Sequence, residues 1–333
     1  MDCLNNLVGI WDGCTAKEDK LYINDLAGFD LSTPEWLVKE QDASPITMLE
    51  GIRNKAGIFL KHEILGNLNP RAQMGSVLWN GTIGIANNNR QTKILEASKL
   101  KGIQVSTENY PYTEIYIDQI AVFPVSTLNN FDVYVYDLTQ GFLLDTFTFD
   151  VTGGEMNYYR VGKTYKNKGQ YLNLAILSDA SLTDMYDVNL TGDGCRTCNT
   201  GLKPVGIYSS GRGVSISNSG SIINSNLRGE SHTNGLSIQY SISCDHDYFV
   251  CSMANRFQLP MYYRFGIELM DEIIFSDRLN SLTTLGLDRA RSMKDELILK
   301  YNETMKGILM NLHVPNNACY VCTSNININT RIP

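Results

Sequence analysis

The sequence contains no apolar run that approaches the roughly 18 residues of a membrane-spanning helix. Its first residues also have neither the basic region nor the apolar region of a secretory signal peptide; they read Met1-Asp2-Cys3-Leu4-Asn5-Asn6-Leu7. A membrane span and a secretory leader are therefore not expected. The sequence predicts a chain that is made and folded in a cytoplasm.

Blocks of lysine and arginine are absent as well. The chain has 28 Lys+Arg against 35 Asp+Glu, which gives a formal net charge of -7. A protein that grips nucleic acid needs a basic surface to neutralise the phosphates. The composition therefore predicts no sequence-specific nucleic-acid binding.

The chain is long enough for two or three domains, because 333 residues with 43% hydrophobic content can bury more than one core. The hydrophobic period changes along the chain, and these changes predict three regions. They are an N-terminal mixed and helical region (1–74), a central antiparallel β-sandwich of jelly-roll type (75–194), and a C-terminal strand with a helical hairpin (195–333). The expected fold class is α+β.

Three stretches have the apolar spacing of amphipathic helices. The first, 46–65, repeats apolar residues such as Leu49, Ile52 and Ala56 every three or four positions. The other two, about 260–279 and 287–312, follow one another near the end of the chain. We expect this second pair to form an antiparallel hairpin docked on an apolar surface.

Short stretches with period 2, rich in β-branched and aromatic residues, predict the strands of the sandwich. The stretch 210–234 is different, because it consists largely of Gly, Ser and Asn. It is predicted to be a long flexible arm that a partner chain orders. The expected strands are 77–86, 102–106, 112–125, 131–138, 142–151, 171–178 and 236–243.

Two Cys-x-x-Cys pairs carry the strongest chemical signal. Two thiolates at this spacing can share a tetrahedral ion, and two such pairs would complete a structural zinc site with four thiolate ligands. The alternative is four reduced, packed thiols, as expected in a reducing compartment. The candidate ligands are Cys195, Cys198, Cys319 and Cys322.

The remaining cysteines, Cys3, Cys14, Cys244 and Cys251, have no recognised ligand spacing and are expected to be core thiols. The sequence Cys244-Asp245-His246-Asp247 gathers a thiol, two carboxylates and an imidazole. No nucleophile elbow accompanies it, so a polar turn after a strand is the favoured interpretation.

Carboxylates and tyrosines offer weaker signals. Asp184, Asp187 and Asp193 lack the ligand order of an EF-hand, which favours solvated side chains over a calcium site. Tyr134 and Tyr136 are expected on the outward face of a strand, among 18 tyrosines. Tyrosine is enriched at interfaces and stacks on sugars, but neighbouring rings also pack on one another, and both interpretations stay open.

Several segments at both ends and in the middle of the chain share a likeness. They are 3–10 with Gly13-Cys14, 21–28, 133–138, 266–269 with 276–280, and 319–322. Together they resemble structural proteins of tailed bacteriophages of Bacteroidetes, notably crAss-like phages. The resemblance implies a virion protein of the portal–tail connector or tail stem, assembled in the host cytoplasm. It supplies no catalytic residues.

The first hypothesis is therefore a non-enzymatic subunit of a homo-oligomeric ring. Its partners would be other connector, portal and tail proteins, and DNA would pass through its lumen. The alternative is a carbohydrate-binding or adhesin module on a virion or cell surface, motivated by the sandwich and its tyrosines. Apart from structural zinc, no cofactor is expected.

Overall fold

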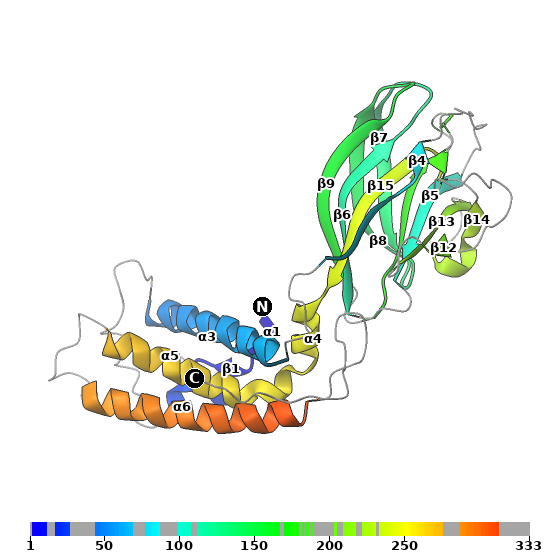
Figure 1. Cartoon of the computed structure of the whole chain (residues 1–333). Coiled ribbons are helices and arrows are strands. Elements are labelled where there is room, and N and C mark those ends of the chain that lie inside the picture. The colour runs from blue at the N-terminus through cyan, green and yellow to red at the C-terminus, as the bar shows by residue number, and fades with distance from the viewer. Residues whose placement is uncertain are drawn as a thin grey trace. The chain divides into compact units, whose positions relative to one another are not determined.

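The computed structural model describes most of the chain. The described residues are 2–11, 17–26, 44–68, 77–86, 99–107, 112–166, 170–179, 182, 184–186, 188–189, 203–204, 209–217, 222–230, 233–275 and 287–312. They form two compact units, one helical and one made of strands (Figure 1).

The two units divide the chain differently from the three consecutive regions expected from the sequence. The helical unit combines the described residues up to 68 with those from 246 to 312, and the β unit contains the residues between them. The strand predicted at 236–243 lies inside the β unit, where it pairs with two other strands, and not with the C-terminal helices. Its alternating apolar residues, such as Ile238 and Ile242, are covered by the facing sheet in the core of the β unit.

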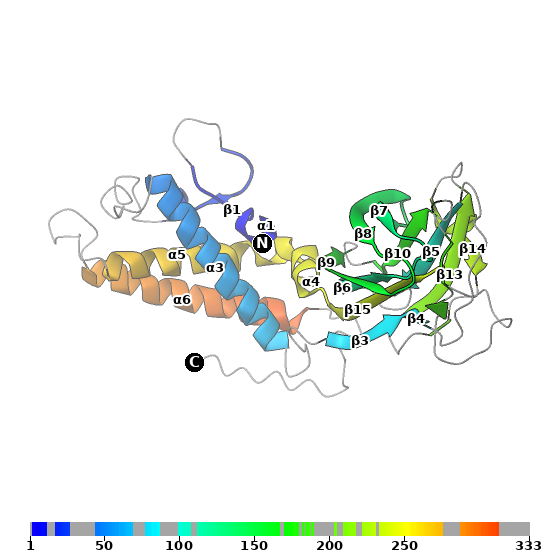
Figure 2. The same cartoon turned by 90° about the horizontal axis from the view of Figure 1, so that it is seen from above.

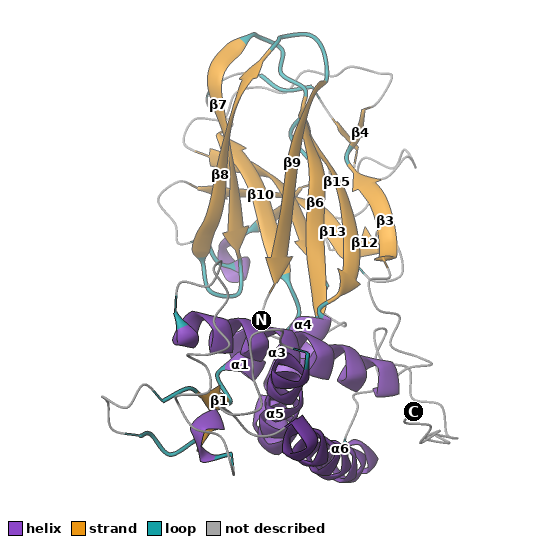
Figure 3. Cartoon of the chain, turned by 90° about the vertical axis from the view of Figure 1, so that its left-hand side faces the viewer, coloured by secondary structure: helices purple, strands orange, loops and turns teal. Residues whose placement is uncertain are grey.

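The β unit is an antiparallel sandwich, which confirms the predicted α+β class. The larger sheet has the order β12-β13-β5-β10-β7-β8, with β14 paired to β13, and the smaller sheet has the order β3-β15-β6-β9 (Figure 3). The larger sheet contains β5 (Lys99–Ser106), β7 (Leu128–Asp137), β8 (Phe142–Val151), β10 (Asn173–Asp179), β12 (Lys203–Pro204), β13 (Ser210–Ser217) and β14 (Arg228–Glu230). The smaller sheet contains β3 (Val77–Ile83), β6 (Thr113–Val122), β9 (Asn157–Lys166) and β15 (Leu236–Cys244), while β4 (Ile85–Ala86) pairs with β11 (Val188–Asn189).

Alternate residues of the two sheets face one another and form the main core. Val133 and Val135 of β7, for example, point inward together with Ile238 and Ile242 of β15. A second, smaller core lies on the outer face of the larger sheet, where Leu177 of β10 packs with residues of β13. The sandwich is therefore buried on both faces of its central strands.

The prediction of a flexible arm at 210–234 is wrong over its described residues. Strand β13 pairs with β5 over its whole length, from Ser210 opposite Ser106 to Ser217 opposite Lys99. Val214 and Ile216 are almost fully buried. The few apolar residues of this stretch are enough to order it, because β5 supplies main-chain hydrogen bonds along the whole of β13.

The helical unit contains three long helices, α3 (Pro45–Leu68), α5 (Gln258–Ile274) and α6 (Leu287–Met310). Helices α5 and α6 run antiparallel, as the colour gradient in Figure 2 shows, and this agrees with the predicted hairpin. The shorter elements are α1 (Asp2–Asn5), β1 (Val8–Gly9), β2 (Leu21–Tyr22), η1 (Ile23–Asp25), α4 (His246–Ser252) and η3 (Ala254–Phe257), whereas η2 (Asn224–Asn226) belongs to the β unit.

The apolar faces of the three long helices meet in one core. Ala56 and Leu60 of α3, Phe265 of α5, and Leu297 and Met305 of α6 are buried there. The described helices include none that is long and apolar enough to cross a membrane.

Candidate functional site

The predicted zinc ligands Cys195, Cys198, Cys319 and Cys322 lie outside the described residues. Asp187 and Asp193 lie outside them too. Among the residues that are described, no group of three or more His, Cys, Asp or Glu side chains could hold a metal ion. The zinc site therefore stays a prediction.

The expectation that Cys3, Cys244 and Cys251 are core thiols is wrong. Cys3 of α1 forms a disulfide with Cys251 of α4, and Cys244 is also disulfide-bonded. The first pair is separated by 248 residues. No spacing rule in the sequence connects cysteines that far apart, because only the packing of α1 beside α4 brings them together. Cys14 lies outside the described residues.

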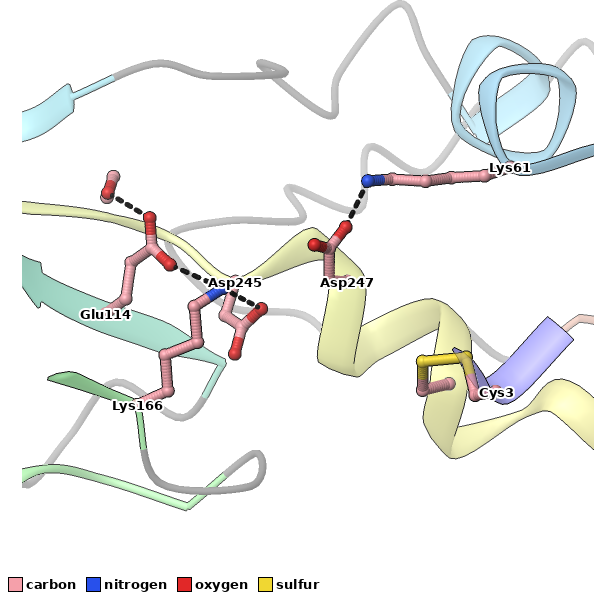
Figure 4. A network of polar contacts seen from close by, with 8 residues as sticks. Cys3, Lys61, Glu114, Lys166, Asp245 and Asp247 are labelled. Atoms are coloured by element: carbon pink, nitrogen blue, oxygen red, sulfur yellow. Dashed lines mark hydrogen bonds and ion pairs between the residues drawn. A yellow bond between two sulfur atoms is a disulfide. The ribbon is translucent and has the colours of Figure 1, made fainter. Parts of the chain in front are cut away.

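The cluster 244–247 is where β15 ends and α4 begins. Within the β unit, the ammonium of Lys166 lies 3.2 Å from Asp245 and 2.8 Å from Glu114 (Figure 4). Within the helical unit, Asp247 forms an ion pair with Lys61 of α3. Both carboxylates are thus paired with lysines. The predicted polar turn is reduced to Asp245, because helix α4 begins at His246, and both of these residues are buried.

Partial burial of Lys166 works against its charge, but the carboxylates of Glu114 and Asp245 outweigh this effect and raise the pKa of Lys166. The side chain of Asp245 is 4% exposed, so the ammonium also supplies the charge that this buried carboxylate needs. The arrangement fixes the end of β15 to β6 and β9. It is a structural contact.

Tyr134 and Tyr136 lie half-buried on the outer face of β7, with ring centroids 6.4 Å apart. Burial raises the pKa of both phenols, and Asp132 accepts a hydrogen bond from the Tyr134 hydroxyl at 3.3 Å. Tyr136 also packs against the smaller core. The geometry favours packing over a free stacking surface at these two rings.

A different surface of the β unit is apolar and open. Three consecutive residues at the start of β8 are strongly exposed: Phe142 at 62%, Leu143 at 50% and Leu144 at 42%. We call these three residues the hairpin patch, because they follow directly on the turn between β7 and β8. An ordinary half-buried strand would expose only every second residue.

Local backbone geometry explains the hairpin patch. The turn closes where the Gly141 N–H donates to the Asp137 carbonyl at 2.7 Å, and Gly141 takes the positive φ of 74° that the turn requires. The pairing of β8 with β7 then shifts, since Val135 faces Asp145 but Tyr136 faces Leu143. Leu144 is thus the extra residue of a bulge, which interrupts the alternation of buried and exposed positions.

Strand β8 is also the last strand of the larger sheet, and among the described strands only β7 pairs with it. Proteins usually protect such an edge with lysine, proline or other devices against pairing with another chain. β8 has neither lysine nor proline in its sequence, FLLDTFTFDV. Side chains of β9 cover its later residues, since the Tyr159 hydroxyl donates to the Asp150 carbonyl and Lys163 pairs with Asp145, but the hairpin patch stays exposed. The neighbouring edge strand β9 differs, because it carries Arg160, Lys163 and Lys166.

Part of this exposed site at the start of β8 could be predicted from the sequence. The strand 142–151 was predicted at its observed limits, and the apolar run Phe-Leu-Leu was visible in it. The exposure of both faces was not predictable, because it depends on the bulge and on the position of β8 at the end of the sheet. The hairpin patch and the edge of β8 form the candidate interaction site.

Comparison with known proteins gives weak matches only. No family model matches the chain, and no curated protein matches it. The chain is similar to a VP2 subviral particle structure of infectious bursal disease virus, with 15% identity, a TM-score of 0.20, and coverage of 49% of this chain and 40% of that chain.

A second structure, of T=1 particles derived from infectious bursal virus, shows 12% identity and a TM-score of 0.21 over 60% of this chain and 54% of that chain. The flagellar cap protein FliD of Escherichia coli, domains D1-D2-D3, matches at 10% identity and a TM-score of 0.10, over 69% of this chain and 72% of that chain. The matches thus span about half of the two viral chains. At such TM-scores these likenesses carry no argument about fold or function.

Proposed function

We propose that this chain is a non-enzymatic virion protein, one subunit of an oligomeric ring in the portal–tail connector or tail stem of a tailed phage. The observation that carries the proposal is the exposed hairpin patch at the start of β8, the last strand of the larger sheet among the described strands. An edge of this kind is a liability for a protein that works alone, and it is useful to one whose neighbours cover it. The sequence resemblance to phage structural proteins supports the same assignment.

The occupant of this edge is a second copy of the chain. When one surface of a subunit binds a different surface of an identical subunit, the contact repeats from copy to copy and closes into a ring if the rotation allows.

The charge of the chain suits a conduit for DNA. A net charge of -7 gives the phosphates of passing DNA little to bind, so the nucleic acid can slide through a lumen. The acidic composition thus agrees with transport of DNA without sequence recognition.

A three-dimensional reconstruction of virions carrying a tag on this chain tests the proposal. The tag should appear at one axial level between the portal and the tail, in several symmetry-related copies. Density on fibres or on the head surface would contradict the ring and favour an adhesin.

The carbohydrate-binding alternative rests on one observation, the exposed ring of Tyr158 on β9, which is 63% exposed. Aromatic rings that face solvent can stack on sugars. A glycan array of the purified chain, with Tyr158→Ala as its matched variant, tests it. Binding that the variant loses would support this alternative, and the absence of binding would exclude it for the glycans on the array.

A further inference from the structure

The helical unit carries an exposed apolar site of its own, on helix α3. Ile58 and Phe59, which are neighbours in the sequence, are 49% and 42% exposed. We call these two residues the α3 patch. The core positions of α3 are already occupied by residues such as Ala56 and Leu60, and the remaining side of a surface helix is normally polar. An apolar pair on that side is typical of a surface that another chain covers.

Cations lie beside the α3 patch. The ammonium of Lys55 is 5.9 Å from the ring centre of Phe59, and the guanidinium of Arg264 is 4.8 Å from the same centre. Glu268 binds both cations, but its side chain is 4% exposed, whereas that of Lys55 is 47% exposed. A chain that approaches the patch therefore meets positive charge at the surface.

The hairpin patch on the β unit has the opposite surroundings. The hairpin from β7 to β8 contains no lysine or arginine, and its four acidic residues are Asp132, Asp137, Asp145 and Asp150. Asp145 pairs with Lys163, but Asp137 lies directly opposite Phe142 and accepts a hydrogen bond from the Thr139 N–H at 2.8 Å. Among the described residues, no lysine or arginine pairs with Asp137. The hairpin patch is thus an apolar surface with a negative charge at its border.

Helix α6 offers another exposed apolar residue, Leu299, which is 63% exposed. The residues one helical turn away from it include Asp295, Glu296 and Glu303. Like charges that face each other across an interface oppose binding, so these carboxylates would repel Asp137. Charge therefore favours the α3 patch over Leu299 as the surface that the hairpin patch can bind.

We propose that the hairpin patch of one copy of this chain docks on the α3 patch of the next copy. The inference rests on the proposed function and specifies the contact between its subunits. Apolar side chains of both patches leave water together, and Asp137 comes beside Lys55 and Arg264. Because the two surfaces differ, every copy offers one of each, and the same contact can repeat around a ring.

Two variants of the full chain, each lacking one surface, test this pairing by native mass spectrometry. The hairpin variant is Phe142→Ser, Leu144→Ser, and the helix variant is Ile58→Glu. Each should be a monomer of 37.3 kDa on its own. An equal mixture should form a complex of twice this mass, because the hairpin variant keeps its α3 patch and the helix variant keeps its hairpin patch. Growth should stop at two copies, since both outer surfaces are disabled.

Leu299→Glu on α6 is the matched control and should form the same oligomer as the wild type. Circular dichroism at 222 nm checks that each variant keeps its helices. If Ile58→Glu loses helicity, Ile58→Ser, which adds no charge, takes its place.

A helix variant that keeps the wild-type oligomer would overturn the pairing, and so would a mixture that stays monomeric. In both cases the oligomer of the wild type would still support a ring, held by other surfaces. A monomeric wild type would contradict the ring itself. A complex of two copies in the mixture, with the tagged chain found away from the tail in virions, would support the pairing and contradict only the proposed location.

Discussion

The ammonium of Lys55 on α3 lies 2.8 Å from the carboxylate of Glu268 on α5, and the Glu268 side chain is only 4% exposed. Arg264, one turn earlier on α5, donates to the same carboxylate at 2.6 Å. This guanidinium also stacks 4.8 Å from the ring centre of Phe59. One buried carboxylate thus joins two helices, and the guanidinium that it holds lies over the partly exposed ring of Phe59.

Glu268→Gln should destabilise the helical unit by about 2 kcal/mol, because the buried site keeps its volume but loses the charge that two cations require. Chemical denaturation followed by circular dichroism at 222 nm measures the change. As a matched control, Glu296→Gln removes the exposed partner of Lys300 on α6 and should change nothing measurable. Equal effects of the two variants would contradict the role of Glu268.

Tyr301 of α6 donates to Glu63 of α3 at 2.6 Å. Burial raises the pKa of Tyr301, and the hydrogen bond to Glu63 adds to this effect. The neutral phenol is thus favoured by folding, so its contribution to stability is complete below pH of about 10 and falls above it as the unfolded chain ionises. Tyr301→Phe should cost about 1 kcal/mol at pH 8 and should lessen the loss of stability between pH 9.5 and 11, measured by urea denaturation. An unchanged pH dependence in the variant would count against this assignment.

Gly102 lies in the middle of β5, where a Cβ atom would come within 2.0 Å of the Ile176 carbonyl oxygen. Gly102→Ala should therefore cost more than about 2 kcal/mol, because a backbone atom must move. Gly51 of α3 has open space around it, and Gly51→Ala should stabilise the protein by about 0.5–1 kcal/mol. Thermal denaturation of both variants measures these opposite changes in stability. An unchanged stability of Gly102→Ala would contradict the close approach of β10 to β5 at this position.

Val214 tests the finding that β13 is a core strand. Its side chain is 1% exposed, so Val214→Ala should cost roughly 1–3 kcal/mol in chemical denaturation. Val77, at the start of β3, is 55% exposed, and Val77→Ala should stay within about 0.5 kcal/mol of the wild type. If Val214→Ala left the stability unchanged, residues 210–217 would behave as a flexible arm and not as a core strand.

Periodicity predicted the long helices, and it predicted β8 from the alternation of residues 145–151 after the turn at Gly141. It failed at β13, because Ser and Gly dominate that strand and its pairing with β5 is a distant contact. Strand β9 was also missed, since Gly162 and three basic residues hide its alternation. Local composition cannot reveal a strand whose stability comes from its neighbours.

The candidate site was predictable only in part for the same reason. The residues of the hairpin patch are visible in the sequence, but the bulge at Leu144 and the end position of β8 depend on the assembled sheet. The disulfide of Cys3 depends on a contact across 248 residues. Both features are products of tertiary packing.

The central claim is that identical copies of this chain associate through the edge of β8. Native mass spectrometry of the purified chain tests it most directly, together with the double variant Phe142→Ser, Leu144→Ser and the control Tyr158→Ser on β9. The wild type and the control should form one closed oligomer whose mass is a multiple of 37.3 kDa, and the double variant should be a folded monomer. A monomeric wild type, or an oligomer that the double variant keeps, would contradict the claim.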